Sequence, residues 1–491
     1  MNTISMRAGF VPSGSAFRVT PPAGLALLRP VYWIAGAVVA GAAYRFGGIE
    51  TATIAIAALI ALWGFAEPRA TLWLATAFMT CLFVFFQREA PLGEEVPEEF
   101  FYWGSGIAVI TAGLFIATLF AGHVDWTSAR KRFLTPPGVA MVALLLVILS
   151  ATVYGLFVGN QMFAAIRQLF GCLLLPVYFF LALVLFRTPA DADRWMRRVS
   201  LVIALGSVWY VQRLSLLSVS HGGYYREQSP LVAYGGAIAV VAWVELMQRQ
   251  RLSLWFQSLA QFLVCVTAIL LMGNRTALGS VLAAIAVVTG LILWSRRGIA
   301  LALAVCLIPV GFGAAPYVMS SLVESRNLPG QIAGRFIFVL AEDRSYQGRV
   351  AQTEVVLSMV NRQPVLGAGM GSENSFVIPG EGRLKVASVD NGWGFLLLKM
   401  GYLGLAVFLV LIGTLLKTAF SGLARVRNAM LRADRLAALG VFVYALVSFL
   451  AGPIFFHFSV APFFGTFLGA LVTLRQSREP EEGISTRGCT A

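Results

Sequence analysis

Residues 139–158 read VAMVALLLVILSATVYGLFV, an apolar run without a charged side chain. A helix of about twenty such residues spans the roughly 30 Å hydrocarbon core of a bilayer. Similar runs recur along the 491-residue chain, which is 58% hydrophobic and only 12% charged, whereas a soluble domain carries about 25% charged residues. The sequence therefore predicts an all-α polytopic membrane protein with about 12–14 transmembrane helices.

The predicted spans divide the chain into five parts. These are a cytoplasmic basic tail (1–28), a helix bundle (29–320), a large outward-facing loop (321–394), C-terminal membrane helices (395–475) and a second cytoplasmic tail (476–491). The last two spans are short and are separated by Gly452-Pro453, so they could form one broken unit. We place the spans at roughly 30–48, 51–66, 70–87, 101–122, 139–158, 167–186, 199–219, 230–248, 255–273, 276–294, 298–320, 395–416, 437–452 and 454–474.

The net charge of +14 has a membrane explanation. Basic residues cluster in alternate loops, and such loops face the cytoplasm. The acidic loop at 89–99 and the 321–394 loop fall on the opposite side, so we expect both to face outward. A partner nucleic acid is not needed to account for the charge. We expect the basic segment 417–436 to be an amphipathic helix on the inner membrane surface.

The longest polar stretch is EDRSYQGRVAQTEVVLSMVNRQPVLGAGMGSENSFVIPGEGRLKVASVDNGWG, which begins at Glu342. We expect short helices in this outer loop. Arg349 is predicted to open one, which Pro364 and Gly367 end. Its membrane-facing stripe is predicted at Val350, Thr353/Glu354, Leu357 and Val360/Asn361.

Arginines near the outer ends of helices are candidate anion ligands, because a guanidinium fork matches phosphate. Arg275 lies in LMGNRTAL, a tight turn between two spans. It could bind an anion there or extend toward lipid headgroups. Arg349 could hold an anion at a helix start or pair with Asp343 or Glu354.

Two further outer segments contain candidate substrate contacts. The turn HGGYYREQSP contains His221 and Arg226, which could bind a sugar or phosphate or could simply be exposed polar residues. Asp390 could act as a general base toward a sugar hydroxyl. Asp390-Asn391 could equally cap the helix beginning near Gly392. Arg344 is a further candidate substrate ligand.

Other sequence features point away from cofactor chemistry. Gly367-Ala368-Gly369-Met370-Gly371 lacks the βαβ context of a dinucleotide site, and a compact turn is favoured. Three scattered histidines form no metal site, and the five cysteines lack disulfide or metal-ligand spacing. We therefore expect no cofactor and no metal.

Three of these segments resemble the O-antigen ligase and polymerase superfamily. They are the turn at 271–278, the Arg-led segment from Gly348-Arg349 to PVLGAGMGS, and Val389-Asp390-Asn391 followed by LLLKMGYLGL. The resemblance covers residues 200–475. It implies a multi-pass glycosyltransferase of the bacterial inner membrane that uses an oligosaccharide on undecaprenyl pyrophosphate at the periplasmic face.

Within that resemblance, the residue before the Asn separates two activities. Ligases usually have His there as the proposed base, whereas this chain has Asp390. The difference favours a polysaccharide polymerase, which would work on lipid-linked repeat units with a possible chain-length co-polymerase partner. Asp390, Arg275 and Arg349 are the expected catalytic residues, and Arg226, Asn391, His221 and Arg344 the expected substrate ligands. The alternatives are a ligase and a transporter of lipid-linked oligosaccharide.

Overall fold

The computed structural model describes residues 23–85, 97–120, 124, 126–220, 231–248, 252–271, 275–295, 344–378, 382–386, 389, 391–423, 426, 428–450 and 452–476. Apart from one short hairpin, the regular structure in these residues is helical. Six of the described helices are long and apolar enough to cross a membrane, with three shorter apolar helices beside them. The predicted all-α membrane fold is confirmed, whereas the number of spans stays a prediction.

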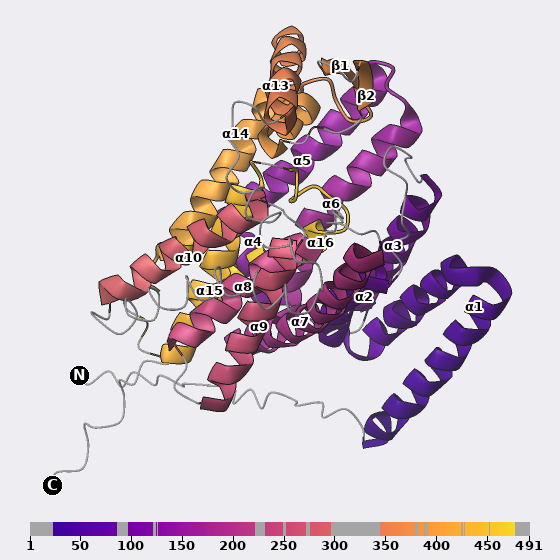
Figure 1. Ribbon diagram of the computed structural model, residues 1–491, viewed down its shortest axis with the longest axis vertical. Helices are drawn as coiled ribbons and strands as arrows, with labels where there is room; N and C mark the ends of the chain where they lie inside the picture. The colour runs from indigo at the N-terminus through magenta and orange to yellow at the C-terminus, as the bar shows by residue number, and fades with distance from the viewer. Residues whose placement is uncertain are drawn as a thin grey trace, which may run out of the picture.

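The N-terminal half of the bundle contains seven described helices (Figure 1). The first bends back on itself at Gly48, whose φ is +72°, so the predicted break between spans 30–48 and 51–66 is confirmed. Figure 1 shows its two limbs as a helical pair at one side of the bundle. The helices are α1 (Ala23–Ala66), α2 (Pro68–Phe85), α3 (Pro97–Phe120), α4 (Trp126–Phe133), α5 (Pro136–Phe157), α6 (Met162–Leu185) and α7 (Pro189–Ser220).

The C-terminal half supplies the centre of the bundle. Its described elements are α8 (Leu231–Gln248), α9 (Leu252–Leu271), α10 (Arg275–Ser295), α13 (Arg344–Arg362), β1 (Asn374–Ile378), β2 (Gly382–Val386), α14 (Gly392–Phe420), α15 (Ala429–Ser448) and α16 (Ala461–Gln476). Within α8, 83% of the apolar span is buried, against 44% in α5. Both sequences are apolar on all sides, so only packing distinguishes the central helix from a peripheral one.

Glycines allow a close contact between α6 and α16. A Cβ on Gly465 would lie 2.5 Å from the Leu175 carbonyl oxygen, and one on Gly469 would lie 2.8 Å from the Phe179 oxygen. The four-residue spacing places both glycines on one face of α16, where they allow the two backbones to approach. The helices run parallel, since the contact moves from Leu175 to Ala182 as α16 advances.

The bundle has two distinct ends. At the end that we call the loop end, α13 and the hairpin lie beyond the adjacent ends of α5, α6 and α14 (Figure 1). The opposite end is the basic end. There Arg132 of α4 donates to carbonyls of 183–187 at the end of α6, and Arg435 donates to carbonyls of Leu474 and Arg475. The two ends agree with the charge asymmetry in the sequence.

Two expectations about short elements are wrong. The segment after the glycine turn forms an antiparallel hairpin, β1 with β2, rather than only helices and polar loop. Residues 417–436 are not one amphipathic helix, because α14 continues to Phe420 and Asn428 caps a new helix. Asn428 accepts from the N–H groups of Met430 and Leu431. Arg435 caps the C-terminal carbonyls of α16 instead of facing lipid.

Candidate functional site

The loop end is built around the turn at residues 364–373. Gly367, Gly369 and Gly371 have φ values of +64°, +76° and +80°, a region that favours glycine. Each also touches a different part of the bundle. Added Cβ atoms would lie 2.4 Å from the Leu398 oxygen, 2.6 Å from the Gly155 Cα and 2.9 Å from the Ala165 nitrogen, respectively. The predicted compact turn is confirmed, and its glycines allow it to pack between helices.

The turn is bound to a break in α14. Gly401 has a φ of +63° inside that helix. Because the helix is interrupted there, the Tyr402 and Leu403 N–H groups donate to the carbonyls of Pro364 (2.8 Å) and Val365 (3.2 Å). In return, the Ala368 N–H donates to the Leu398 carbonyl at 2.7 Å. Backbone groups freed by the break are thus satisfied by the turn.

The same turn is held by the connection between α5 and α6. The side-chain amide of Asn160 donates to the carbonyls of Ala368 and Met370, both at 2.9 Å. Gln168 Oε1 accepts from the Gly371 N–H at 2.8 Å, and the Met370 N–H donates to the Ala151 carbonyl. These contacts join residues about two hundred positions apart, so the turn has one defined position relative to both halves of the bundle.

A buried lysine completes this network. Lys399 of α14 has no exposed surface. Its Nζ donates to the Ser372 carbonyl oxygen at 2.5 Å and to the Ser372 Oγ at 2.9 Å. The Ser372 hydroxyl donates in turn to the Gly369 carbonyl. An amine inside an apolar helix requires such acceptors, and here the glycine turn provides them.

The start of α14 carries the best-described predicted site residue. Asn391 is the N-cap, and its Oδ1 accepts from the Trp393 N–H at 3.0 Å. The Gly392 N–H donates to the Phe449 carbonyl beyond α15. The capping role that the sequence offered for Asn391 is therefore confirmed. Capping uses only the side-chain oxygen of Asn391, so its amide N–H groups can donate hydrogen bonds to a ligand.

The helix α13 packs over Val389, two residues before the N-cap Asn391. Val356 and Val360 pack with Ala368, Val389 and Leu398 in a small apolar cluster. The predicted stripe is only partly correct. Val360 is buried, but Leu357 is 41% exposed, and Gln352, Val356 and Val360 form the buried row. The difference is a rotation of the helix, because residues four apart share a face.

Two of the predicted arginines are the first residues of helices. Arg275 is the first residue of α10. Arg344 is the first residue of α13, so Arg349 lies in the second turn and does not open the helix as expected. Helix N-termini attract anions through free N–H groups and the helix dipole. The backbone position of Arg275 fits that role, and Arg344 fits it better than Arg349. The side chains of all three lie outside the described part.

Three predicted residues cannot be placed. Asp390, Arg226 and His221 lie outside the described residues. Asp390 is nevertheless bracketed, because Val389 before it is 2% exposed and Asn391 after it caps α14. Neither Lys399 nor Ser372 was predicted from the sequence as a site residue. A lysine within an apolar span is the signal that could have found the first of them.

The resemblance to the O-antigen ligase and polymerase superfamily has support from a family match. The O-antigen ligase family profile matches residues 260–409. The chain carries an O-antigen ligase family domain. Its match begins within α9 and ends within α14, and it includes the glycine turn. Arg275, Arg349 and Asp390 lie inside the O-antigen ligase match, whereas His221 and Arg226 precede it. Among curated proteins, none matches the chain.

The family match supports a coarse functional statement. Members of this family, ligases and polymerases, are membrane glycosyltransferases that act on lipid-linked glycans. The chain is thus a multi-pass membrane protein that carries an O-antigen ligase family domain at residues 260–409. The family resemblance of the three motifs is confirmed for residues 260–409.

Proposed function

We propose that this protein is a polysaccharide polymerase. It would transfer glycan from an undecaprenyl-pyrophosphate-linked repeat unit to a sugar hydroxyl of another lipid-linked glycan, at the periplasmic face of the bacterial inner membrane. The observation that carries the proposal is Asp390, directly before the capping Asn391 inside the O-antigen ligase match. Ligases that resemble this chain usually have histidine at that position.

The proposed reaction is an inverting displacement without a metal ion. The acceptor hydroxyl oxygen attacks the anomeric carbon, and its proton passes to the Asp390 carboxylate. The bond between the anomeric carbon and the pyrophosphate oxygen breaks, and undecaprenyl pyrophosphate leaves with the bonding electrons. Arg275 and Arg349, aided by Arg344, stabilise the developing negative charge.

Helix starts support this assignment of roles. Arg275 begins α10 and Arg344 begins α13, so both lie where N–H groups and the helix dipole favour a pyrophosphate. Arg349 lies about 10 Å along the helix axis from Val356, which packs against Val389. A pyrophosphate bound by an extended arginine could bridge that separation toward residue 390.

The packing around Asp390 supports its role as the base. A general base needs a fixed position, because transfer efficiency depends on geometry before pKa. Val389 is buried beneath α13, and Asn391 is fixed by its cap hydrogen bond. Asn391 would contribute its amide N–H groups to the acceptor. His221 and Arg226, which lie outside the described residues, would contact sugar or phosphate.

A ligase is the second candidate, favoured by the description of the matching family itself. In that case the transferred glycan is a finished chain, and the acceptor is a lipid or a protein. A transporter of lipid-linked oligosaccharide is disfavoured by the same match, since the family carries out group transfer.

Lipid-linked glycans that accumulate in a deletion strain, sized by mass spectrometry, test the proposal. A polymerase predicts single repeat units on undecaprenyl pyrophosphate and no long polymer. Long chains retained on the carrier beside an unmodified acceptor would instead establish a ligase. Repeat units confined to the cytoplasmic leaflet would contradict both enzymes and establish transport.

A further inference from the structure

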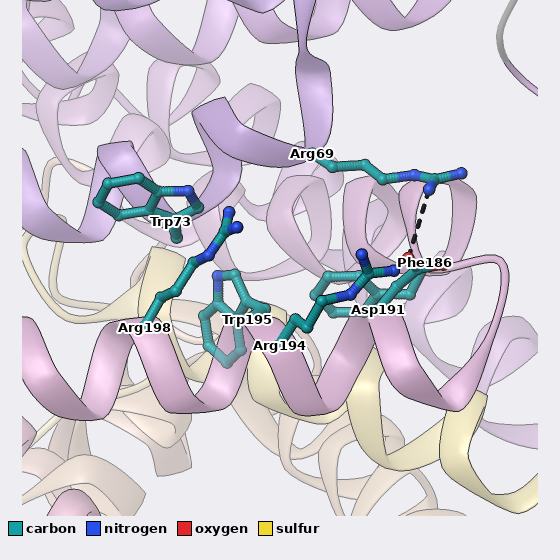
Figure 2. Close-up of a pocket in the computed structure, with 7 residues that line it drawn as sticks. All are labelled: Arg69, Trp73, Phe186, Asp191, Arg194, Trp195 and Arg198. Carbon is teal, nitrogen blue, oxygen red and sulfur yellow. Dashed lines mark hydrogen bonds and ion pairs between the residues drawn. The ribbon is translucent and has the colours of Figure 1, made fainter. Parts of the chain in front are cut away.

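A hollow at the basic end has more hydrogen-bond donors than acceptors. It lies between the start of α2 and the first turns of α7 and has a volume of about 80 Å³. Figure 2 shows the side chains of Arg69 and Trp73 from one helix facing those of Arg194, Trp195 and Arg198 from the other. This hollow is at the opposite end of the bundle from the glycine turn, because α6 runs the full distance between them.

One carboxylate in the hollow is already fully engaged. Asp191 Oδ1 accepts from Arg69 at 3.3 Å and from Arg194 at 2.7 Å. Its Oδ2 accepts from the backbone N–H groups of Arg187 and Thr188 and from the Thr188 hydroxyl. A carboxylate offers about four acceptor positions, so Asp191 has none left for another donor.

Two indole N–H groups in the same hollow have no acceptor among the described residues. They are Nε1 of Trp73 and Nε1 of Trp195. Trp195 is only 2% exposed, and its ring is fixed against Phe463 and Phe467. Figure 2 shows both indole nitrogens on the side of their rings that faces the Arg198 guanidinium. A buried donor without an acceptor costs about 1–3 kcal/mol.

Arg198 adds a positive charge at this place. Its guanidinium carbon lies 5.7 Å from the centre of the Trp73 ring. Arg69 and Arg194 share the single carboxylate of Asp191. With Arg198 the hollow therefore has three cations and one anion, and the donors around its opening are indoles and guanidinium groups, which cannot accept. The missing partner is an anion with several acceptor oxygens.

We propose that the hollow between α2 and α7 binds the phosphate group of an anionic ligand through Arg198 and the indole N–H groups of Trp73 and Trp195. Arginine and tryptophan suit this role at a membrane boundary, where tryptophan is enriched and basic residues attract anionic lipids. A phospholipid headgroup is the expected source of the phosphate, and free phosphate is the other. The site is separate from the proposed transfer site at the loop end.

Ligand-dependent stabilisation of the purified full-length protein tests the proposal. Delipidated protein in detergent is titrated with phosphatidylglycerol, phosphatidylcholine or inorganic phosphate, and its thermal unfolding midpoint is recorded. We expect phosphatidylglycerol to raise the midpoint of the wild type by mass action. In Arg198→Gln and Trp195→Phe the apparent affinity should fall about ten- to a hundredfold, the loss expected for a hydrogen bond to a charged group.

Arg187→Gln is the matched control. This arginine is exposed in the connection between α6 and α7 and does not line the hollow, and its substitution removes the same charge as Arg198→Gln. It should bind phosphatidylglycerol like the wild type. Arg198 is also exposed, so Arg198→Gln tests the site even if Trp195→Phe fails to fold.

Each pattern of results decides the proposal. Protection by inorganic phosphate alone, lost in Arg198→Gln but not in Arg187→Gln, supports the phosphate site and identifies free phosphate as its source. Equal weakening by Arg198→Gln and Arg187→Gln would overturn it, because general attraction to the basic end would then suffice. Unchanged affinity in both site variants would overturn it as well.

Discussion

The glycine turn at the loop end and the hollow at the basic end both hold buried polar groups, but with opposite outcomes. In the turn, Lys399 meets two oxygens of Ser372, and Asn160 meets two carbonyls. In the hollow, two indole N–H groups meet no described acceptor. Buried polar groups that hydrogen-bond to one another stabilise the fold, whereas a cluster of buried donors without acceptors indicates a missing ligand.

The largest expected effect is a loss of glycan transfer on substitution of Asp390 at the loop end, compared with loss of an exposed charge at the basic end. Asp390→Asn should lower glycan transfer about 10²–10⁴-fold, because the variant cannot accept the proton of the attacking hydroxyl. Polymer made by the variant in a deletion strain, normalised to membrane protein level, measures this. Arg187→Gln removes an exposed charge at the other end and should leave transfer unchanged. Polymer at wild-type levels in Asp390→Asn would remove this residue from the mechanism.

The next effect concerns the close packing of the glycine turn. Gly369→Ala should lower the free energy of unfolding by about 2 kcal/mol or more, since its Cβ would lie 2.6 Å from the Gly155 Cα and its φ is +76°. Gly159→Ala is the control, because Gly159 has a φ of +90° but nothing within 4 Å. It should show only the backbone cost, about 1–2 kcal/mol. Equal losses in the two variants would mean that the turn is not tightly held.

A smaller effect is expected for the buried lysine network. Ser372→Ala removes one of the two acceptors of Lys399 and should cost about 1.5–3 kcal/mol of stability in detergent. Ser358→Ala makes the same chemical change on an exposed part of α13 and should change stability by less than about 0.5 kcal/mol. Thermal unfolding of both variants compares them directly. A neutral Ser372→Ala would show that Lys399 finds another acceptor.

The smallest effect distinguishes the two roles of Asn391. Asn391→Ala should lower stability by about 0.5–2 kcal/mol through loss of the α14 cap. Asn391→Asp keeps a capping oxygen and should restore stability. It also removes the amide N–H groups, so transfer should stay low if these bind the acceptor. Full recovery of transfer in Asn391→Asp would limit Asn391 to capping.

The sequence was most informative where a single physical rule dominates. Hydrophobic length located the helices, the Gly48 break was visible between two apolar runs, and the 364–373 turn followed from its proline and glycines. Three motifs located the O-antigen ligase domain. The short hairpin was missed, although NSFVI and GRLKV flank a Pro-Gly turn signal.

Features that depend on distant partners were not predictable. Arg435 reads as a lipid-facing charge, but its partners are carbonyls of α16, about forty residues later. The face of α13 could not be oriented because its stripe is weakly apolar, and contact with Ala368 and Leu398 decides it. The pairing of Arg69 with Asp191 joins two helices that nothing local connects. Such contacts are consequences of tertiary packing.

The hydrogen bonds of the glycine turn determine which segments of the chain must stay together in a fragment or a chimera. The matched segment, 260–409, contains the turn, but Ala151, Asn160 and Gln168 lie outside it and hold four of its backbone groups. A fragment limited to the family match would thus lack the surface on which its own turn rests. In evolutionary terms, the segment cannot be transplanted alone, and a chimera must carry α5 and α6 with it.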